Sequence, residues 1–169
     1  MLMIRKTEEK DLAAVMDIIH EGTAYFARNG IPQWQNGYPN EETIREDIRN
    51  GHAFVLESDG AVIGTAAVID ARDPDYDYIE NGSWLNEDDY IVIHRIALTP
   101  SSKGKGLAEE FLAFAAEEGI KKGIHNLRID THEKNSSMRS FLMKNGFTRC
   151  GNVYIGGTAP RIAYQKIID

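Results

Sequence analysis

The hydrophobic pattern is most distinctive between Tyr90 and Glu118, and the rest of the chain is arranged around this stretch. Residues 90–98 form a run of mainly β-branched and apolar side chains without a helical period, which predicts a strand. Pro100 ends the run, because proline cannot continue a central ladder. A helical period follows, with Leu107, Phe111, Leu112, Ala115 and Ala116 on its apolar face. We therefore predict a strand, a tight turn and a helix in succession.

Strands and helices are also predicted along the rest of the chain. The strands lie at residues 3–6, 53–57, 61–70, 126–131, 148–155 and 161–168, and a further helix lies at 136–145. Thr7 and Asn40 are natural N-caps for two more helices near the start of the chain. The length of 169 residues predicts one domain over residues 1–169. The order β-α-α-β-β-β-α-β-α-β-β predicts a mixed sheet with helices on both faces.

The turn between the central strand and its helix carries the first candidate chemistry. Lys103, Gly104, Lys105, Gly106, Leu107 and Ala108 stand at the predicted helix start. Glycines let the backbone approach a ligand closely, and the N–H groups of a first helical turn point at an anion. A Walker A loop does not fit, because Gly106 occupies the place of its hydroxyl residue. A dinucleotide fingerprint does not fit either, since Glu109 replaces its third glycine. On its own, the loop is as consistent with a tight strand-to-helix turn as with an anion site.

This loop resembles the pyrophosphate loop of the GNAT N-acetyltransferase superfamily, Gln/Arg-x-x-Gly-x-Gly/Ala. Lys103 takes the Gln/Arg place, Gly106 the glycine and Ala108 the last small residue. Lysine is a departure that keeps the charge and loses the guanidinium fork. The next family motif is matched by Asn135, a short helix containing Met138, and the run Lys144-Asn145-Gly146-Phe147. The resemblance extends over essentially the whole chain and is strongest from residue 90 to residue 147.

The resemblance implies a fold and a cosubstrate. The fold is α/β (α+β), the GNAT fold, with a mixed, mostly antiparallel sheet of about six to seven strands flanked by about four helices. The cosubstrate is acetyl-CoA, and no metal is expected. Ile96, Ala97 and Leu98 would pair through their backbone with the pantetheine arm, and residues 103–108 would hold the pyrophosphate. Asn135 and Met138 would contact the cofactor from another side.

The implied reaction is direct attack of an amine on the acetyl thioester in a ternary complex, with a backbone N–H, that of Ile96, polarising the thioester oxygen. A protonated amine cannot attack, so a base is needed. His94 is the first candidate, because strict alternation would put it on one face with Ile96 and histidine titrates in the useful range. A structural histidine bonded to backbone is the alternative reading. His132 is a second candidate, His20 and Glu21 are weaker ones, and Val92 stands where the family often has a carboxylate.

The leaving group shows another departure from the family. Many members place a tyrosine two residues before the lysine of Lys-x-Gly-Phe, where it can protonate the departing thiolate. That position here is Leu142. We therefore expect the sulfur to leave as the thiolate or to take a proton from water, which a thiol pKa of about 8.5 allows.

The acceptor is expected to be a small, cationic amine. Trp34 and Tyr38 lie in the loop of residues 30–39, in a region that commonly shapes the acceptor pocket of the family, and both could instead cap the edge of the core. The segment 71–89 is rich in acidic residues, and the chain has a net charge of −7, both of which suit a cation. The same charge argues against a nucleic-acid partner.

Composition narrows the remaining possibilities. No apolar run approaches a membrane span, and the lone Cys150 cannot form an internal disulfide, so a reducing cytoplasm is expected. The main hypothesis is an acetyl-CoA-dependent N-acetyltransferase (an acyltransferase) for a small-molecule amine, with a homodimer left open. The alternatives are a CoA-binding regulatory module of the same fold without turnover and a nucleotide-binding module, against which the loop mismatches argue.

Overall fold

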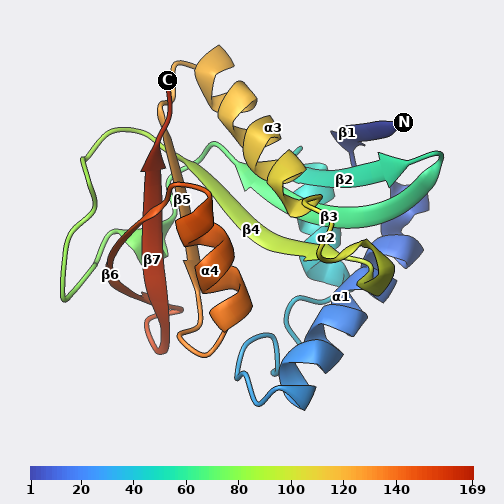
Figure 1. The fold of residues 1–169 in the computed structure, drawn as a ribbon, viewed down its shortest axis with the longest axis horizontal. Helices are drawn as coiled ribbons and strands as arrows, with labels where there is room; N and C mark the ends of the chain where they lie inside the picture. The colour runs from blue at the N-terminus through green and yellow to red at the C-terminus, as the bar shows by residue number, and fades with distance from the viewer. The chain divides into compact units, whose positions relative to one another are not determined.

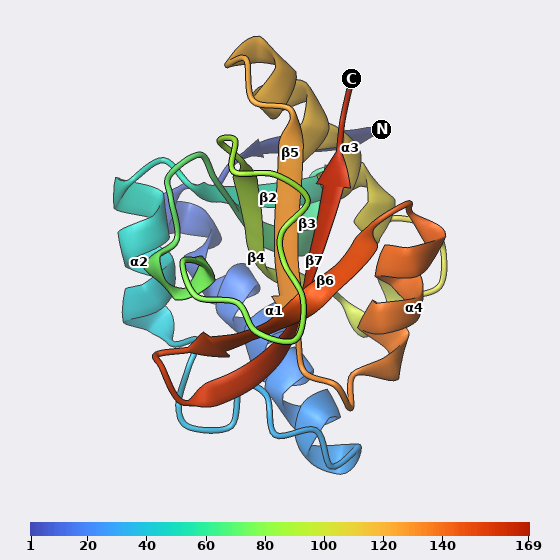
Figure 2. The same ribbon diagram turned by 90° about the vertical axis from the view of Figure 1, so that its left-hand side faces the viewer.

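The computed structural model describes residues 1–169 and contains seven strands and four α-helices (Figures 1 and 2). The strands are β1 Leu2–Lys6, β2 Ala53–Ser58, β3 Ala61–Ile69, β4 Ile91–Leu98, β5 Asn126–Thr131, β6 Thr148–Ile155 and β7 Ala159–Ile167. The helices are α1 Leu12–Arg28, α2 Glu41–Arg49, α3 Ala108–Lys121 and α4 Ser136–Lys144. The predicted order of strands and helices is confirmed. None of the helices has both the length and the apolar composition needed to cross a bilayer.

All seven strands belong to one sheet in the order β1-β2-β3-β4-β5-β7-β6. Neighbouring pairs β1·β2, β2·β3, β5·β7 and β6·β7 are antiparallel, whereas β4 and β5 are parallel. A parallel pair needs a crossover, and α3 lies in the connection between β4 and β5. The predicted mixed, mostly antiparallel sheet flanked by helices is therefore confirmed.

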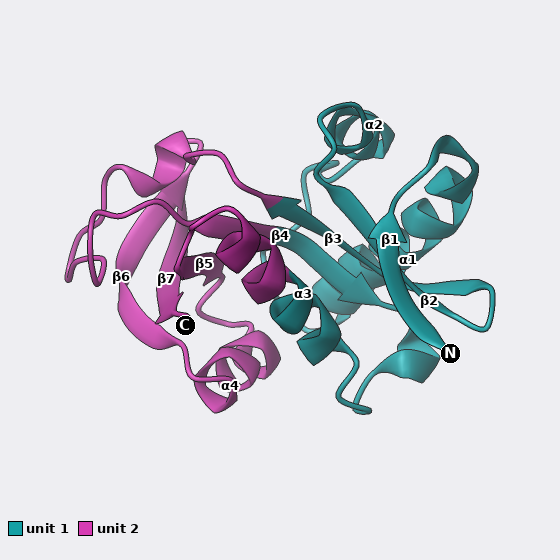
Figure 3. Ribbon diagram, turned by 90° about the horizontal axis from the view of Figure 1, so that it is seen from above, with its two compact units in different colours: residues 1–68, 94–114 teal, residues 69–93, 115–169 magenta.

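The chain forms two compact units, which are described separately (Figure 3). The first unit comprises residues 1–68 and 94–114, so it holds β1, β2, α1, α2, β3 except its last residue, most of β4 and the first half of α3. Its core includes a cluster of Leu12, Val15, Ile19, Ile44 and Val55. Two turns of α1 and one of α2 thus supply apolar side chains at helical spacing to pack on β2.

The second unit comprises residues 69–93 and 115–169. A core cluster joins Tyr76 and Tyr90 to Val92, Val153 and Ala163. The hydroxyl of Tyr76 donates to Asp130 Oδ2 at 2.6 Å, and Tyr90 Oη accepts the backbone N–H of Asp73 at 2.8 Å. The acidic segment 71–89 is therefore anchored by buried aromatics rather than being solvated throughout.

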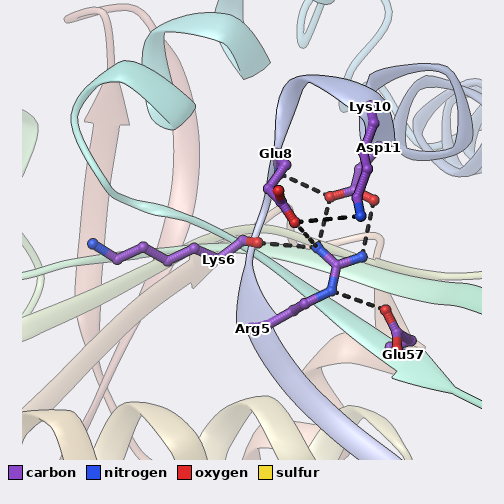
Figure 4. Close-up of polar contacts among 6 residues, drawn as sticks. All are labelled: Arg5, Lys6, Glu8, Lys10, Asp11 and Glu57. Carbon is purple, nitrogen blue, oxygen red and sulfur yellow. Dashed lines mark hydrogen bonds and ion pairs between the residues drawn. The ribbon is translucent and has the colours of Figure 1, made fainter. Parts of the chain in front are cut away.

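The start of α1 differs from the sequence expectation. Thr7 is not an N-cap; Glu8 caps a short 3-10 helix, Glu9–Asp11, and α1 follows it. The reason is Asp11, whose Oδ2 accepts the backbone N–H of Glu8 at 2.8 Å (Figure 4). Arg5 donates to both oxygens of the same carboxylate, at 2.8 and 3.0 Å, and orients it. A tertiary ion pair has thus moved the cap by one residue.

Candidate acetyl-CoA site

The turn between β4 and α3 has the backbone that its glycines predict. Gly104 has φ +75° and Gly106 has φ +73°, a region that other residues rarely adopt. A Cβ at Gly104 would meet no atom within 4 Å, and one at Gly106 would meet only Glu109 Oε2, at 3.7 Å. Both glycines therefore face open space just before α3 begins at Ala108. Two exposed glycines in the left-handed region at a helix N-terminus fit a phosphate group.

Lys103, the residue at the Gln/Arg place of the motif, makes a different contact. Its Nζ lies 4.4 Å from the centroid of the Tyr25 ring on α1. This is a cation–π contact, which at an exposed site contributes about 0.5–1 kcal/mol. The ring thus limits the range of positions that the Lys103 ammonium group takes beside the loop.

β4 contains an unusual backbone conformation at Arg95, with φ +55°. This conformation costs a residue with a Cβ about 1–2 kcal/mol and is typical of the first residue of a bulge. Arg95 stands between His94 and Ile96, the two residues that are predicted from the sequence to act at the reaction centre. The strict alternation that predicts a shared face for those two residues is interrupted here.

The side chain of Arg95 is held from two sides. Its Nε and Nη2 donate to Asp47 of α2 at 2.9 and 2.8 Å, a bidentate ion pair with both side chains only 10% exposed. Its Nη1 donates to Tyr38 Oη at 2.7 Å. Planar two-point pairs of this kind are the strongest and most directional polar contacts in proteins.

The two aromatic residues expected at the acceptor pocket have different surroundings. Trp34 packs edge-on against Phe26, with ring centroids 5.3 Å apart, and it adjoins the core cluster of the first unit. A Cβ on Gly22 would come within 2.9 Å of the Trp34 ring. These contacts favour the reading of Trp34 as a cap on the core. Tyr38 is 45% exposed and is tied to β4 through Arg95.

The histidines differ in how they are held. His94 is partly exposed on β4, whereas His20 is exposed on α1 together with Glu21. His132 is buried, and its Nδ1 accepts the backbone N–H of Lys134 at 3.0 Å. Burial, and then the charge of Arg161, lower the pKa of His132. Its ring is therefore neutral with Nδ1 already engaged, which supports a structural role.

Asn135 and Met138 belong to the second unit, at the start of α4. Asn135 is buried and caps this helix, with its Oδ1 accepting the Met138 N–H at 3.2 Å. The capping role explains an asparagine at this position without a ligand, and it fixes the first turn of α4. Cofactor contact by Asn135 and Met138 stays a prediction.

Comparison with known proteins decides the family. The sequence model described as the acetyltransferase (GNAT) family matches residues 18–147. The chain belongs to this family. A GNAT acetyltransferase from Streptococcus agalactiae is 39% identical, with a TM-score of 0.87 over 99% of this chain and 96% of that one. A comparison with curated proteins gives no significant match.

More distant acetyltransferase structures share the fold. A protein from Salmonella typhimurium, solved with its cofactor acetyl-CoA, is 19% identical, with a TM-score of 0.70 over 100% of this chain and 95% of that one. PaiA N-acetyltransferase from Thermoplasma acidophilum, in complex with coenzyme A, is 22% identical, with a TM-score of 0.71 over 99% of both chains.

The structure of this GNAT protein also shows two interacting side chains that the sequence analysis missed. Asp47 and the side chain of Arg95 were not singled out. A signal for Asp47 was present, because it falls three residues after the buried Ile44 and one before Ile48, on the apolar stripe of a helix. An acid at such a position needs a buried cation. Nothing in the sequence marks the positive φ of Arg95.

Proposed function

We propose that this GNAT protein is an acetyl-CoA-dependent N-acetyltransferase that acetylates a small, cationic amine in a ternary complex. The observation that carries the proposal is the turn at Gly104 and Gly106, open to solvent and placed directly before α3. Structures of the same fold that were solved with acetyl-CoA or CoA support the choice of cosubstrate.

The cosubstrate would be held mostly through backbone groups. Residues 103–108 would receive its pyrophosphate, the backbone of Ile96, Ala97 and Leu98 would pair with its pantetheine arm, and Asn135 and Met138 would lie against it. Bound acetyl-CoA supplies an activated acetyl group as a thioester. The glycine turn leaves room for phosphate oxygens where a side chain would intrude.

Two residues of the chain would then act on the reacting groups: one would stabilise the charge on the thioester oxygen, and one would accept the amine proton. The N–H of Ile96 would donate to the thioester oxygen as negative charge gathers there. His94 would take the proton from the attacking amine, directly or through a water. Leu142 has a hydrocarbon side chain with no proton to give, so this position of α4 offers no acid to the departing sulfur.

The first test is direct. Thiol release from acetyl-CoA is measured with a panel of amines, and steady turnover with at least one cationic amine is expected. If the protein binds CoA but turns over no amine, a regulatory module is favoured instead. The absence of a tyrosine at the position of Leu142 is compatible with such a module. We place the reaction in the cytoplasm, where the single free thiol of Cys150 would stay reduced.

The cofactor loop is tested by Gly106→Glu, which adds bulk and negative charge where backbone would meet phosphate. We expect the wild type to bind acetyl-CoA with a micromolar Kd and the variant to bind it at least about 100-fold more weakly, as measured by calorimetry. Gly60→Glu is the matched control, because Gly60 also has a positive φ and open space, in the turn between β2 and β3. Equal affinities in the two variants would remove the loop from the cofactor site.

A further inference from the structure

The backbone conformation of Arg95 is not explained by packing alone. A residue with a Cβ sits in the left-handed region in the middle of β4, where glycine would fit without strain. Such strain persists only where the surroundings over-determine the conformation, and it clusters at functional sites. The next residue, Ile96, carries the N–H that the proposed reaction uses.

Three elements of the first unit meet at this side chain. Asp47 comes from α2 and fixes the guanidinium at two points, at 2.8 and 2.9 Å. Tyr38 comes from the loop of residues 30–39 and accepts a third hydrogen bond, at 2.7 Å. With Arg95 held from both directions, rotation of its backbone toward an extended φ would pull the guanidinium out of a fixed, directional pair.

We propose that Asp47 and Tyr38 act through Arg95 as a lock on the backbone of β4, which makes these three residues positioning residues for the N–H of Ile96 and for His94. This inference rests on the proposed function, because the lock would serve acetyl transfer. It also couples the loop of residues 30–39, where an acceptor is expected, to the strand that would bear the reacting groups. An acceptor that displaces Tyr38 would alter one of the three hydrogen bonds on Arg95.

The backbone at residue 95 is tested by comparing two substitutions at one position. Arg95→Ala removes the lock and leaves a residue that disfavours a positive φ by about 5–30-fold in population. Arg95→Gly removes the same contacts but adopts a positive φ readily. We expect kcat to fall by about 5- to 30-fold in Arg95→Ala, in line with that population, and to be at least about threefold higher in Arg95→Gly, with KM for acetyl-CoA within about threefold in both. Equal losses in the two variants would overturn the proposal, because the side chain rather than the backbone would then matter.

The ion pair is tested against a matched pair elsewhere in the same unit. Asp11 is buried and accepts two hydrogen bonds from Arg5, at 2.8 and 3.0 Å (Figure 4). Asp11→Asn therefore breaks an ion pair of similar geometry that does not involve β4. Asp47→Asn should lower kcat by about 10-fold, while Asp11→Asn lowers thermal stability and leaves kcat within about twofold. Tyr38→Phe, which removes one hydroxyl, should lower kcat by about threefold. A loss of kcat in Asp47→Asn no larger than in Asp11→Asn would overturn the lock.

A readout without turnover separates this proposal from the proposed function. The backbone carbon chemical shifts of residue 95 report whether φ stays positive. We expect them to keep left-handed values in Asp11→Asn and to move toward extended values in Asp47→Asn and Arg95→Ala. If no amine is acetylated but the shifts move in this way, the lock stands and its assignment to acetyl transfer fails. Unchanged shifts in Asp47→Asn and Arg95→Ala would overturn the lock itself, with or without turnover.

Discussion

At the scale of single residues, the proposed chemistry depends on three neighbours in β4. His94 has a side chain that can take a proton, and Ile96 has a backbone N–H that can donate. Arg95, between them, has a backbone in the left-handed region and a guanidinium clamped by Asp47 and Tyr38. The roles of the first two are predictions from the sequence, where residue type and position carry their chemistry. The conformation of the third was not, since it depends on a carboxylate 48 residues away along the chain.

The role of His94 gives a kinetic prediction. His94→Ala should lower turnover by about 100-fold or more, the usual effect of a lost general base, with acetyl-CoA affinity within about threefold of the wild type. The wild-type rate should fall on the acid side as the base becomes protonated, and the variant should lose that limb. His132→Ala is the control, and its acid limb should stay in place. Near-wild-type activity of His94→Ala with an unmoved acid limb would make His94 structural.

At the scale of elements, the hydrophobic pattern predicted almost all of the secondary structure. The strand at residues 126–131 is found with those bounds, and the helix expected over 136–145 ends one residue earlier. These elements were accessible because periodicity and caps are local. The start of α1 was missed because a partner from β1, Arg5, orients the capping carboxylate of Asp11. The spacing of apolar positions does not show a capping carboxylate that is oriented by a charge on the preceding strand.

The Asp11 cap gives a prediction about stability and pH. Arg5, which donates to the Asp11 carboxylate, lowers the pKa of that group below its ordinary value. A carboxyl with a lowered folded-state pKa contributes stability that is fully present above its unfolded pKa and is lost as pH falls through the folded one. Asp11→Asn should therefore cost about 2 kcal/mol of unfolding free energy at pH 7, the typical value of hydrogen bonds to a charged group. The difference from wild type should shrink as pH falls below about 4.

Urea unfolding at pH 7 and pH 3 measures this difference. Asp59→Asn is the control, because Asp59 pairs with the chain's amino terminus while its side chain is 81% exposed. That pair is fully screened by solvent, so its loss should not be measurable. A deficit of Asp11→Asn that is the same at both pH values would assign the effect to packing rather than to charge.

At the scale of the whole molecule, charge is the property most open to experiment. The net charge is −7, and seven acids lie in the segment of residues 71–89: Asp73, Asp75, Asp77, Glu80, Glu87, Asp88 and Asp89. The structure divides this set. Asp77 pairs with Arg72, and Glu80 accepts hydrogen bonds from Tyr78 and Tyr154. The run of residues 87–89 is exposed, which leaves it as the part of the segment most able to attract a distant cation.

Attraction over such distances is screened by salt, so it can be separated from direct contact. The Debye length falls from about 30 Å at 0.01 M salt to about 8 Å at 0.15 M. We expect kcat/KM for a cationic amine to fall by about threefold or more over that range, and kcat/KM for a neutral amine analogue to change little. Neutralising the run with Glu87→Gln, Asp88→Asn and Asp89→Asn together should remove most of the salt dependence. Neutralising three other exposed acids, Asp17, Glu46 and Glu117, should leave it in place.

Since both triple variants change the net charge by the same amount, a difference between them can only come from where the charges lie. Equal effects would mean that overall charge attracts the amine, and a best acceptor that is neutral or anionic, with no salt dependence, would contradict the cationic assignment.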